Sequence, residues 1–335
     1  MTTAANGPVR LGVVGLGWWG KVLADAAGRS GVVDVVACFA RTEASRERFA
    51  AEVGCRPASS LPELLTADDI EGVLFATPNT THLGQIREAA AAGRHVFVEK
   101  PLALTVAEAQ QAVVAAEAAG VVLMVGHQRR RQAPNRRIRQ LLDDGSLGTP
   151  LLAEASFTTS SGYPPTWRAS RDETPLGAMT GLGVHMVDTF HYLLGPVSRV
   201  SAFSKQAIDG EPLDHATGLL LEFLSGAVGT LLCSHFAPPA SRIAVHGTGG
   251  AAANVQDGAR LMVQRAGEST LREVDVASTD PVVEQLAEFA AAIRGDGKVE
   301  TGGHEALAVV AVMEAAIASA RTGVAVTIPA DPTGS

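Results

Sequence analysis

The sequence predicts an α/β protein of two domains: a doubly wound parallel sheet over residues 1–125, and an α/β domain with a largely antiparallel open sheet over residues 126–335. Three observations lead to this prediction. Apolar runs alternate with helical stretches through the first part of the chain, a glycine-rich turn follows the first run, and past Gly126 the runs change to alternating polarity. A chain of 335 residues is long enough for two domains.

The first domain is predicted from strands that alternate with helices of about ten to fifteen residues, a pattern that indicates a parallel sheet covered on both faces. The expected strands are Val9–Val14, Val32–Phe39, Gly72–Ala76, His95–Val98 and Val121–Val125, and the expected helices are Lys21–Ala27, Ala44–Glu52, Thr81–Ala92 and Thr105–Ala119.

The second domain is predicted from runs bounded by turn residues, which indicate an antiparallel sheet. The expected strands are Leu151–Thr159, Val197–Gln206, Gly218–Leu224, Val228–Ser234, Arg242–His246 and Leu261–Arg265. Helices are expected at Pro134–Asp143, Val282–Arg294 and Glu305–Arg321, with a glycine-rich loop at Gly295–Gly303 and a polar tail, DPTGS.

Composition excludes several classes of protein. Hydrophobic residues make up 46% and charged residues 19%, which is ordinary globular usage. The net charge of −8 gives no basic field for nucleic acid or an anionic membrane. Three cysteines without a CxxC pair, no export signal, and a single long apolar stretch that carries Glu314 predict a soluble, cytoplasmic protein.

The segment VVGLGWWG places Gly15, Gly17 and Gly20 in GxGxxG spacing, directly after a predicted strand and at the start of a predicted helix. In a Rossmann dinucleotide site the first glycine allows the tight turn, the second lets the pyrophosphate approach, and the third lets the helix pack. We therefore expect this loop to bind a dinucleotide. Trp18 and Trp19 fill the variable positions, where one ring could face the nicotinamide or the substrate, or both could serve packing.

The end of the second predicted strand reads CFARTEASR, so Ala40 and Arg41 stand where an NAD site would place an acidic partner for the ribose hydroxyls. A planar guanidinium suits the 2′-phosphate of NADP. The sequence favours NADP over NAD, with Arg41 as the phosphate partner. The alternative is that Arg41 is a solvated loop residue and that either cofactor is used.

Two further segments, ATPNTTH and EKP, each follow a strand of the parallel sheet, where ligands gather in open α/β folds. Together with the glycine loop, VGHQRRR, TWR and GLGVHMVD, they resemble the Gfo/Idh/MocA family of dehydrogenases over nearly the whole chain. The resemblance implies a nicotinamide-dependent oxidoreductase with an N-terminal Rossmann domain. It also implies sugars, inositols or other cyclic polyols as substrates.

The resemblance assigns roles residue by residue. It makes Lys100 the active-site lysine, followed by Pro101 in a bond that is often cis, and His185 the catalytic histidine. It also implies that a set of residues in the first domain lines the cofactor: Thr77, Pro78, Asn79, His82, Glu99 and Lys100. On the substrate side it implies Trp167, Arg168 and one of the arginines Arg129 and Arg130, while the rigid segment around Tyr163 could form a wall.

The family pattern is DxGxHxxD, but Gly181 stands at its first acidic position. This departure leaves the partner of His185 open, and the remaining Asp188 is expected to be structural. Oxidation of a secondary alcohol needs a base beside the hydroxyl, and His185 has a suitable ordinary pKa. Lys100 could act as a base if burial and a bound cation favoured its neutral form, or stay charged and stabilise the alkoxide.

The arginines between Arg129 and Arg139 form the one basic cluster, which we expect to be a solvated helix face rather than a nucleic-acid site. The remaining histidines, His235 among them, show no metal-binding spacing, so no metal is expected.

Three hypotheses stay open. The first is an NADP- or NAD-dependent dehydrogenase or reductase, whose substrate is sugar-like or an aromatic dihydrodiol. The second is a glycosidase of the same family without net cofactor turnover, and the third is a non-catalytic dinucleotide sensor. A homodimer or homotetramer is expected, because the open sheet would otherwise expose apolar surface.

Overall fold

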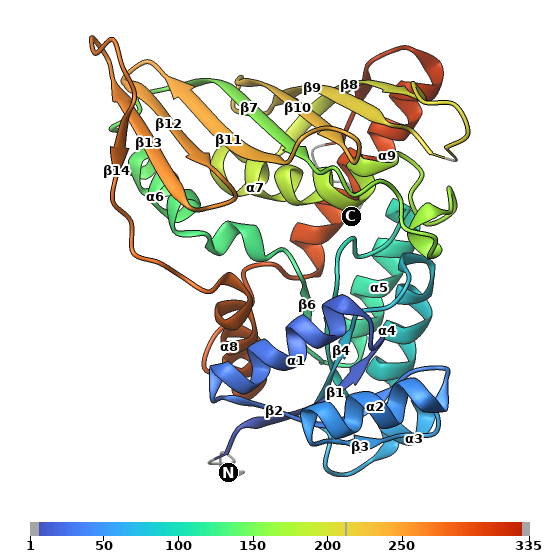
Figure 1. Cartoon of the computed structure of the whole chain (residues 1–335). Coiled ribbons are helices and arrows are strands. Elements are labelled where there is room, and N and C mark those ends of the chain that lie inside the picture. Colours follow the sequence, from blue (N-terminus) through green and yellow to red (C-terminus); the bar gives the residue numbers. More distant parts are fainter. Residues whose placement is uncertain (1–6, 212, 330–335) are drawn as a thin grey trace. The chain divides into compact units, whose positions relative to one another are not determined.

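The computed structural model of the protein describes residues 7–211 and 213–329, and these form two compact units (Figure 1). Unit 1 contains residues 7–103, 107–128 and 280–307. Unit 2 contains residues 104–106, 129–279 and 308–329. Each unit is described by itself below.

Unit 1 is built on a six-stranded parallel sheet in the order β3-β2-β1-β4-β5-β6. The strands are β1 (Val9–Val14), β2 (Val33–Phe39), β3 (Arg56–Pro57), β4 (Gly72–Phe75), β5 (His95–Val98) and β6 (Leu123–Val125). The order reverses between β1 and β4, so the carboxyl ends of these two strands border the switch point at which doubly wound folds bind their ligands. This confirms the predicted parallel sheet.

The helices of unit 1 follow the predicted alternation. They are α1 (Trp18–Ser30), α2 (Glu43–Val53), α3 (Leu61–Thr66), the 3₁₀ helix η1 (Asn79–Thr81), α4 (His82–Ala91), α5 (Val106–Ala118) and α8 (Pro281–Arg294). Apolar residues of β1, α1 and β5 form one buried core with the inner face of α8.

Helix α8 lies far along the chain but packs on the parallel sheet of unit 1. Its Phe289 ring meets Phe97 of β5 edge to face, with ring centres 6.0 Å apart. Asp280 caps its first turn and accepts a hydrogen bond of 2.9 Å from Arg29 of α1. The predicted division at residue 125 had placed this segment in the second domain, whereas its apolar face is buried on the first.

Unit 2 contains a nine-stranded sheet in the order β14-β13-β12-β11-β7-β10-β9-β8-β15, in which β7 and β10 are parallel and all other neighbours are antiparallel. The strands are β7 (Pro150–Thr158), β8 (Val197–Lys205), β9 (Ala216–Phe223), β10 (Val228–Ser234), β11 (Ala240–Gly247), β12 (Gly250–Val255), β13 (Arg260–Arg265), β14 (Arg272–Val274) and β15 (Val326–Thr327). The largely antiparallel sheet is confirmed.

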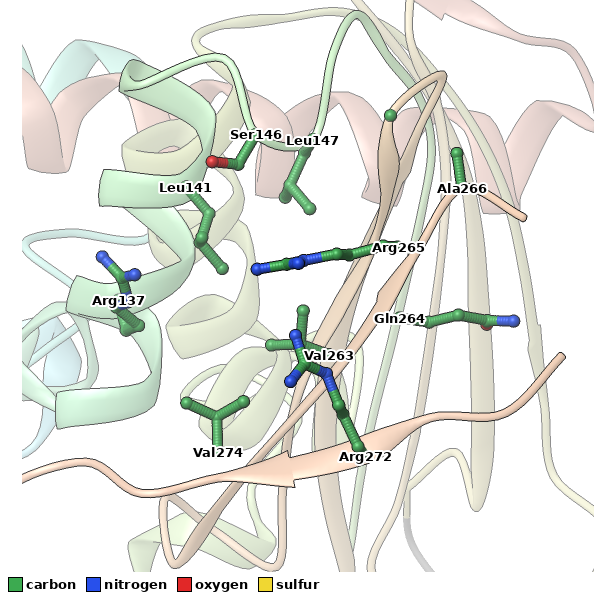
Figure 2. Close-up of a pocket in the computed structure, with 11 residues that line it drawn as sticks. Arg137, Leu141, Ser146, Leu147, Val263, Gln264, Arg265, Ala266, Arg272 and Val274 are labelled. Carbon is green, nitrogen blue, oxygen red and sulfur yellow. The ribbon is translucent and has the colours of Figure 1, made fainter. Parts of the chain in front are cut away.

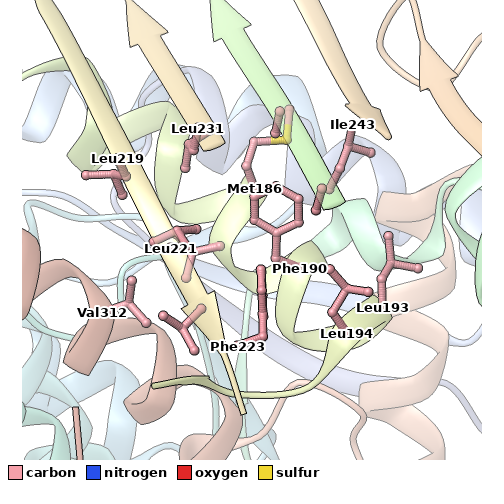
Figure 3. Close-up of a cluster of buried hydrophobic side chains, with 14 of the residues drawn as sticks. Met186, Phe190, Leu193, Leu194, Leu219, Leu221, Phe223, Leu231, Ile243 and Val312 are labelled. Atoms are coloured by element: carbon pink, nitrogen blue, oxygen red, sulfur yellow. The ribbon is translucent and has the colours of Figure 1, made fainter. Parts of the chain in front are cut away.

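Helices cover one face of this sheet, as Figure 1 shows. They are α6 (Ala133–Asp143), α7 (Val184–Leu194) and α9 (Gly303–Thr322), and short helical turns lie at η2 (Gln128–Arg131), η3 (Trp167–Ala169) and η4 (Met179–Gly183). Phe190 of α7, Val312 of α9 and Leu221 of β9 are completely buried in the core between these layers (Figure 3).

The opposite face of the sheet of unit 2 carries exposed apolar side chains. Alternate residues of β9 and β10 are buried and exposed, and the register pairs exposed positions of neighbouring strands on one face. Five large side chains on it are between 37% and 71% exposed, namely Leu152, Phe203, Leu220, Val228 and Leu232. We call these five residues the open-face patch.

Helix α9 is long and apolar enough to cross a membrane by length and composition alone. More than half of its apolar window is buried inside the fold, however, which is typical of a core helix in a soluble protein. The predicted tail DPTGS lies outside the described residues.

Candidate active site

The glycine loop joins β1 to α1, and its three glycines have different surroundings. Gly15 adopts a φ of +90°, and a Cβ built on it would lie 2.4 Å from the carbonyl oxygen of Ala76. A Cβ on Gly20 would lie 2.1 Å from the carbonyl oxygen of Gly15. A Cβ on Gly17, by contrast, would meet no atom within 4 Å. The fold itself requires the first and third glycines, whereas the second keeps space open above the loop.

The open space lies at the start of α1, whose first turn holds no acidic residue and receives no hydrogen bond from a capping side chain. The amide groups of this turn and the positive end of the helix dipole suit a phosphate. The loop therefore fits the pyrophosphate of a dinucleotide. Trp18 beside it is 71% exposed, and its ring meets Trp19 at 4.8 Å edge to face.

Substituting the glycines one at a time separates these roles. Gly17→Ala is expected to leave the thermal midpoint unchanged and to weaken NAD(P)H binding by about tenfold or more, since the added methyl group enters the phosphate approach. Gly20→Ala is expected to lower the thermal midpoint as well, because its Cβ would collide with the loop backbone. Thermal unfolding and fluorescence titration with NADPH measure both effects, and equal destabilisation by both substitutions would contradict this account.

Arg41 follows β2 with an exposed side chain. The backbone around it is held by Arg46 of α2, whose guanidinium donates hydrogen bonds of 2.9 Å to the Ala40 carbonyl and 3.4 Å to the Arg41 carbonyl. Arg46 thus holds the backbone of this loop, and the Arg41 side chain lies at the surface beside the end of β2.

The loops after β4 and β5 are tied together by His82, which is completely buried. Its Nδ1 lies 2.9 Å from the carbonyl oxygen of Pro101, and its Nε2 lies 3.2 Å from that of Thr77. Because both ring nitrogens contact main-chain carbonyls, the role that the structure gives His82 is to hold these two loops together. The Thr77 hydroxyl donates a 2.6 Å hydrogen bond to Gln85, and Asn79 is buried in the following turn.

The EKP segment begins directly after β5. Glu99 is 5% exposed, and a Cβ built on Gly126, after β6, would lie 2.8 Å from its carboxylate oxygen Oε1. Gly126 therefore makes the room that this carboxylate occupies. Lys100 is half-buried, and the Lys100-Pro101 peptide is cis, as the resemblance implied. The glycine loop and the EKP segment both lie at the carboxyl edge of the same sheet.

In unit 2, His185 lies in the first turn of α7 and is 4% exposed. The ring of Phe157, near the end of β7, is tilted against it with ring centres 6.4 Å apart. The guanidinium of Arg129 also stacks on the Phe157 ring, with its central carbon 4.1 Å from the ring centre. The same aromatic ring thus contacts both the predicted catalytic histidine and a cation.

The expectation of a solvated arginine face is wrong for Arg129, Arg130 and Arg131, which are all buried in η2. The charges of Arg129 and Arg130 are paired with carboxylates within the fold, as buried charges require. Arg129 forms an ion pair with Asp257 and donates a 3.1 Å hydrogen bond to Ser241; burial lowers its pKa, and the carboxylate opposes that shift.

Arg130 donates two hydrogen bonds, of 2.8 and 2.7 Å, to the carboxylate of Asp188. Asp188 is completely buried on α7, one turn after His185. This bidentate pair anchors the helix that carries the histidine. Of the two arginines expected near substrate, Arg130 is engaged in this internal pair.

The Tyr163 hydroxyl donates a 2.6 Å hydrogen bond to the Asp214 carbonyl, and burial raises its pKa to about 12. Its ring faces His235, with centres 5.1 Å apart. Further along, Trp167 is half-buried, and the guanidinium of the exposed Arg168 stacks 4.1 Å from its ring centre. The ring of Tyr163 is thus packed with its hydroxyl directed at the main chain of Asp214, whereas Trp167 and Arg168 form a separate contact nearer the surface.

His235, which the sequence left among the histidines without a role, lies next to Gly181. Its Nε2 is 3.8 Å from the Cβ position of that glycine. The only sequence signal for this contact was the missing acidic residue at position 181. Among residues 7–211 and 213–329, no group of three His, Cys, Asp or Glu side chains is arranged to hold a metal ion.

A cavity of about 510 Å³ lies elsewhere in unit 2, between α6 and the strands β13 and β14 (Figure 2). Three guanidinium groups and apolar side chains line it, including Arg137, Arg265, Arg272, Leu141 and Val263. None of the predicted site residues lines this cavity. The candidate site therefore rests on the chemistry at the strand ends and not on this cavity.

Comparisons with known proteins show the family of the chain. The sequence profile of the GFO_IDH_MocA oxidoreductase family, with an NAD-binding Rossmann fold, matches residues 9–127. The profile of the GFO/IDH/MocA C-terminal domain matches residues 135–253.

Individual relatives extend over almost the whole chain. The 1,5-anhydro-D-fructose reductase of Ensifer adhaerens is 29% identical over 334 residues, which cover 92% of this chain and 98% of the relative. The rhizopine catabolism protein MocA of Rhizobium meliloti is 30% identical over 315 residues, which cover 92% and 93% of the two chains. A solved structure from Desulfitobacterium hafniense DCB-2, reported as a candidate NADPH-dependent oxidoreductase, is 30% identical with a TM-score of 0.91 over 96% of this chain and 98% of that one. The chain belongs to the Gfo/Idh/MocA family of NAD(P)-dependent oxidoreductases.

Proposed function

We propose that this oxidoreductase transfers a hydride between nicotinamide and a secondary alcohol or ketone of a sugar, a cyclitol or a related cyclic polyol. One observation carries the proposal: at the carboxyl edge of one parallel sheet, Gly17 leaves space for a dinucleotide while Glu99 and Lys100 follow β5. The relative from Ensifer adhaerens, named for 1,5-anhydro-D-fructose, supports a cyclic sugar as substrate.

The residues have distinct tasks in this proposal. When bound, the nicotinamide would supply the hydride acceptor or donor. Hydride can leave a secondary alcohol only as its hydroxyl proton leaves, so a side chain has to take that proton. We assign this task to His185, with Lys100 hydrogen-bonding the same oxygen and stabilising the charge that develops on it. The packing of Phe157 and the pair of Arg130 with Asp188 keep the histidine in place.

For the cofactor we propose NADP over NAD, with Arg41 holding the 2′-phosphate. Arg41→Ala is expected to raise the KM for NADP by about 10- to 100-fold, the usual range for a lost charge-assisted hydrogen bond, and to leave the KM for NAD unchanged. Arg48→Ala, which removes another exposed arginine of α2, is the matched control. An unchanged preference for NADP in Arg41→Ala would refute the assignment.

We also propose a homodimer or homotetramer that buries the open-face patch. Leu232→Glu places a charge in the middle of this face and is expected to shift the protein to monomers in light scattering. Leu271→Glu, at an exposed leucine outside the sheet face, should not change the mass. A monomeric wild-type protein would overturn this proposal.

Spectroscopy with purified protein tests the reaction itself. NADP and NAD are offered with sugars, inositols and their keto derivatives, and absorbance of the reduced nicotinamide is followed. Substrate-dependent change of this absorbance is the expected result. Cofactor binding without turnover on any compound would instead support the glycosidase or the sensor.

A further inference from the structure

Position 181 is where the structure of this chain departs most clearly from the DxGxHxxD pattern. Gly181 lies in the π-helical turn η4, which continues directly into α7, and His185 follows four residues later. Residues at this spacing lie on one side of a helix, so a side chain at 181 would point to the same side as the histidine. Outside its own helix backbone and chain neighbours, the nearest atom to the Cβ position of Gly181 among residues 7–211 and 213–329 is Nε2 of His235, at 3.8 Å.

The chain builds His235 into this position through the parallel pair of strands β7 and β10. Both strands end at the same edge, and beyond them the Thr159 amide donates a 2.9 Å hydrogen bond to the Ser234 carbonyl. The Gly162 amide then donates a 3.0 Å bond to the carbonyl of His235. The backbone of the histidine is thereby fixed on both sides, although the residues come from segments about seventy positions apart.

The imidazole ring is oriented as well. Its Nδ1 lies 2.9 Å from the Thr159 hydroxyl, and the Tyr163 ring packs against it edge to face. With Nδ1 engaged by Thr159 and one face covered by tyrosine, the ring presents Nε2 towards Gly181. A histidine that merely filled space would not need a hydrogen-bond partner on the far nitrogen to hold this direction.

The partner of Nδ1 also gives the ring two usable states. The Thr159 hydroxyl lies 3.0 Å from the exposed Ser161 hydroxyl, and hydroxyl groups both donate and accept. If Thr159 donates to Nδ1, then Nε2 carries the hydrogen and is a donor. If Nδ1 donates to Thr159, which in turn donates to Ser161, then Nε2 is an acceptor. His235 can therefore receive a hydrogen bond from a substrate hydroxyl or give one to it.

We propose that His235 is a substrate-contacting residue that supplies, through Nε2, the polar group that Gly181 lacks. It would hydrogen-bond a ring hydroxyl of the cyclic polyol beside the position served by His185. Gly181 and His235 depend on each other in this role, because a larger residue at position 181 would lie directly against Nε2 of His235. This inference rests on the proposed function and adds a specificity-determining residue to it.

The test is loss and rescue on the best substrate of the sugar and inositol panel. His235→Ala is expected to lower kcat/KM by about 10- to 100-fold, because a substrate hydroxyl would lose its hydrogen-bond partner at a half-buried position. Adding Gly181→Asp to His235→Ala should recover at least tenfold, since the carboxylate enters the vacated space. Gly181→Ala in the same background should recover nothing, which excludes a simple gain in helix stability.

Control measurements separate folding from recognition. His246→Ala removes a histidine of β11 that pairs with Glu154 of β7, and this variant should match the wild type. NADPH affinity and thermal midpoint are measured for every variant, and Thr159→Val, which removes the partner of Nδ1, provides a milder second variant with the same direction of effect.

The outcomes are distinct. Full activity of His235→Ala, or a loss that Gly181→Asp leaves unrecovered in a folded protein, overturns this inference while the proposed function stands. No turnover by the wild type on any compound overturns the proposed function, and this inference falls with it.

Discussion

Lys100→Met is expected to lower turnover by roughly 100- to 10,000-fold, the range over which a group that handles the reacting proton contributes. Methionine keeps the length and apolar body of lysine, and Lys100 is half-buried after β5, so the fold should tolerate the change. NADPH affinity should stay within a few fold of the wild type, because the substitution leaves the proposed phosphate site at Gly17 untouched. Steady-state kinetics and fluorescence titration on one preparation measure both quantities.

Two further variants sharpen this result. Lys298→Met removes an exposed lysine of unit 1 and should leave turnover unchanged. Lys100→Arg keeps the positive charge but cannot give up its proton at accessible pH. Partial activity of the arginine variant would assign Lys100 an electrostatic role, whereas complete loss would assign it a proton. Normal turnover of Lys100→Met would show that the family's lysine role does not apply here.

The first half of the chain could be predicted from the sequence because its signals are local. Except for the two-residue β3, the strands of unit 1 are largely apolar runs, several of its helices are alanine-rich, and Gly15 and Gly20 lie where a β-turn-α unit needs them. No local signal, however, places α8 on this sheet. Phe289 reaches Phe97 only because the chain returns after the whole of the second sheet, and periodicity cannot report such a return.

The arginine run shows a second limit. A block of like charges is typical of a solvated surface, and this was our expectation. Its burial depends on Asp188 and Asp257, which lie 58 and 128 residues further along the chain. A single sequence contains these carboxylates but does not show which cation each will meet. The strand β12 was missed for a simpler reason, since its run of alanines lacks the β-branched and aromatic residues typical of strands.

The candidate site, too, could be predicted from the sequence only in part. Motif spacing located the glycine loop, the EKP segment and His185, because each is contained within a few residues. His235 could not be found, since its relation to Gly181 arises from the pairing of β7 with β10 and from the hydrogen bond of its ring to Thr159. The missing acidic residue signalled that something differed at this place, and only the fold showed which side chain is there.

The largest expected effect on stability concerns the carboxylate that the family pattern retains. Asp188→Asn changes one oxygen for an amide group of the same size, so packing around α7 is preserved. The Arg130 guanidinium, 7% exposed, would then lose the counter-charge that Asp188 supplies in the interior. Breaking a buried pair in this way typically costs about 3 to 5 kcal/mol of unfolding free energy, which is a large share of the stability of an ordinary domain.

An exposed ion pair provides a reference for the free-energy cost of breaking the buried pair. Arg139 and Asp143 of α6 form an exposed ion pair at i and i+4, for which Asp143→Asn should cost only about 0.3 to 0.5 kcal/mol. Urea unfolding of the two variants compares the costs directly. The double variant Arg130→Met with Asp188→Asn should be more stable than Asp188→Asn alone, because the buried guanidinium that lost its carboxylate partner is removed as well. Equal, small losses in both single variants would mean that the pair of Arg130 and Asp188 is solvated when the protein is in solution and does not anchor the helix that carries His185.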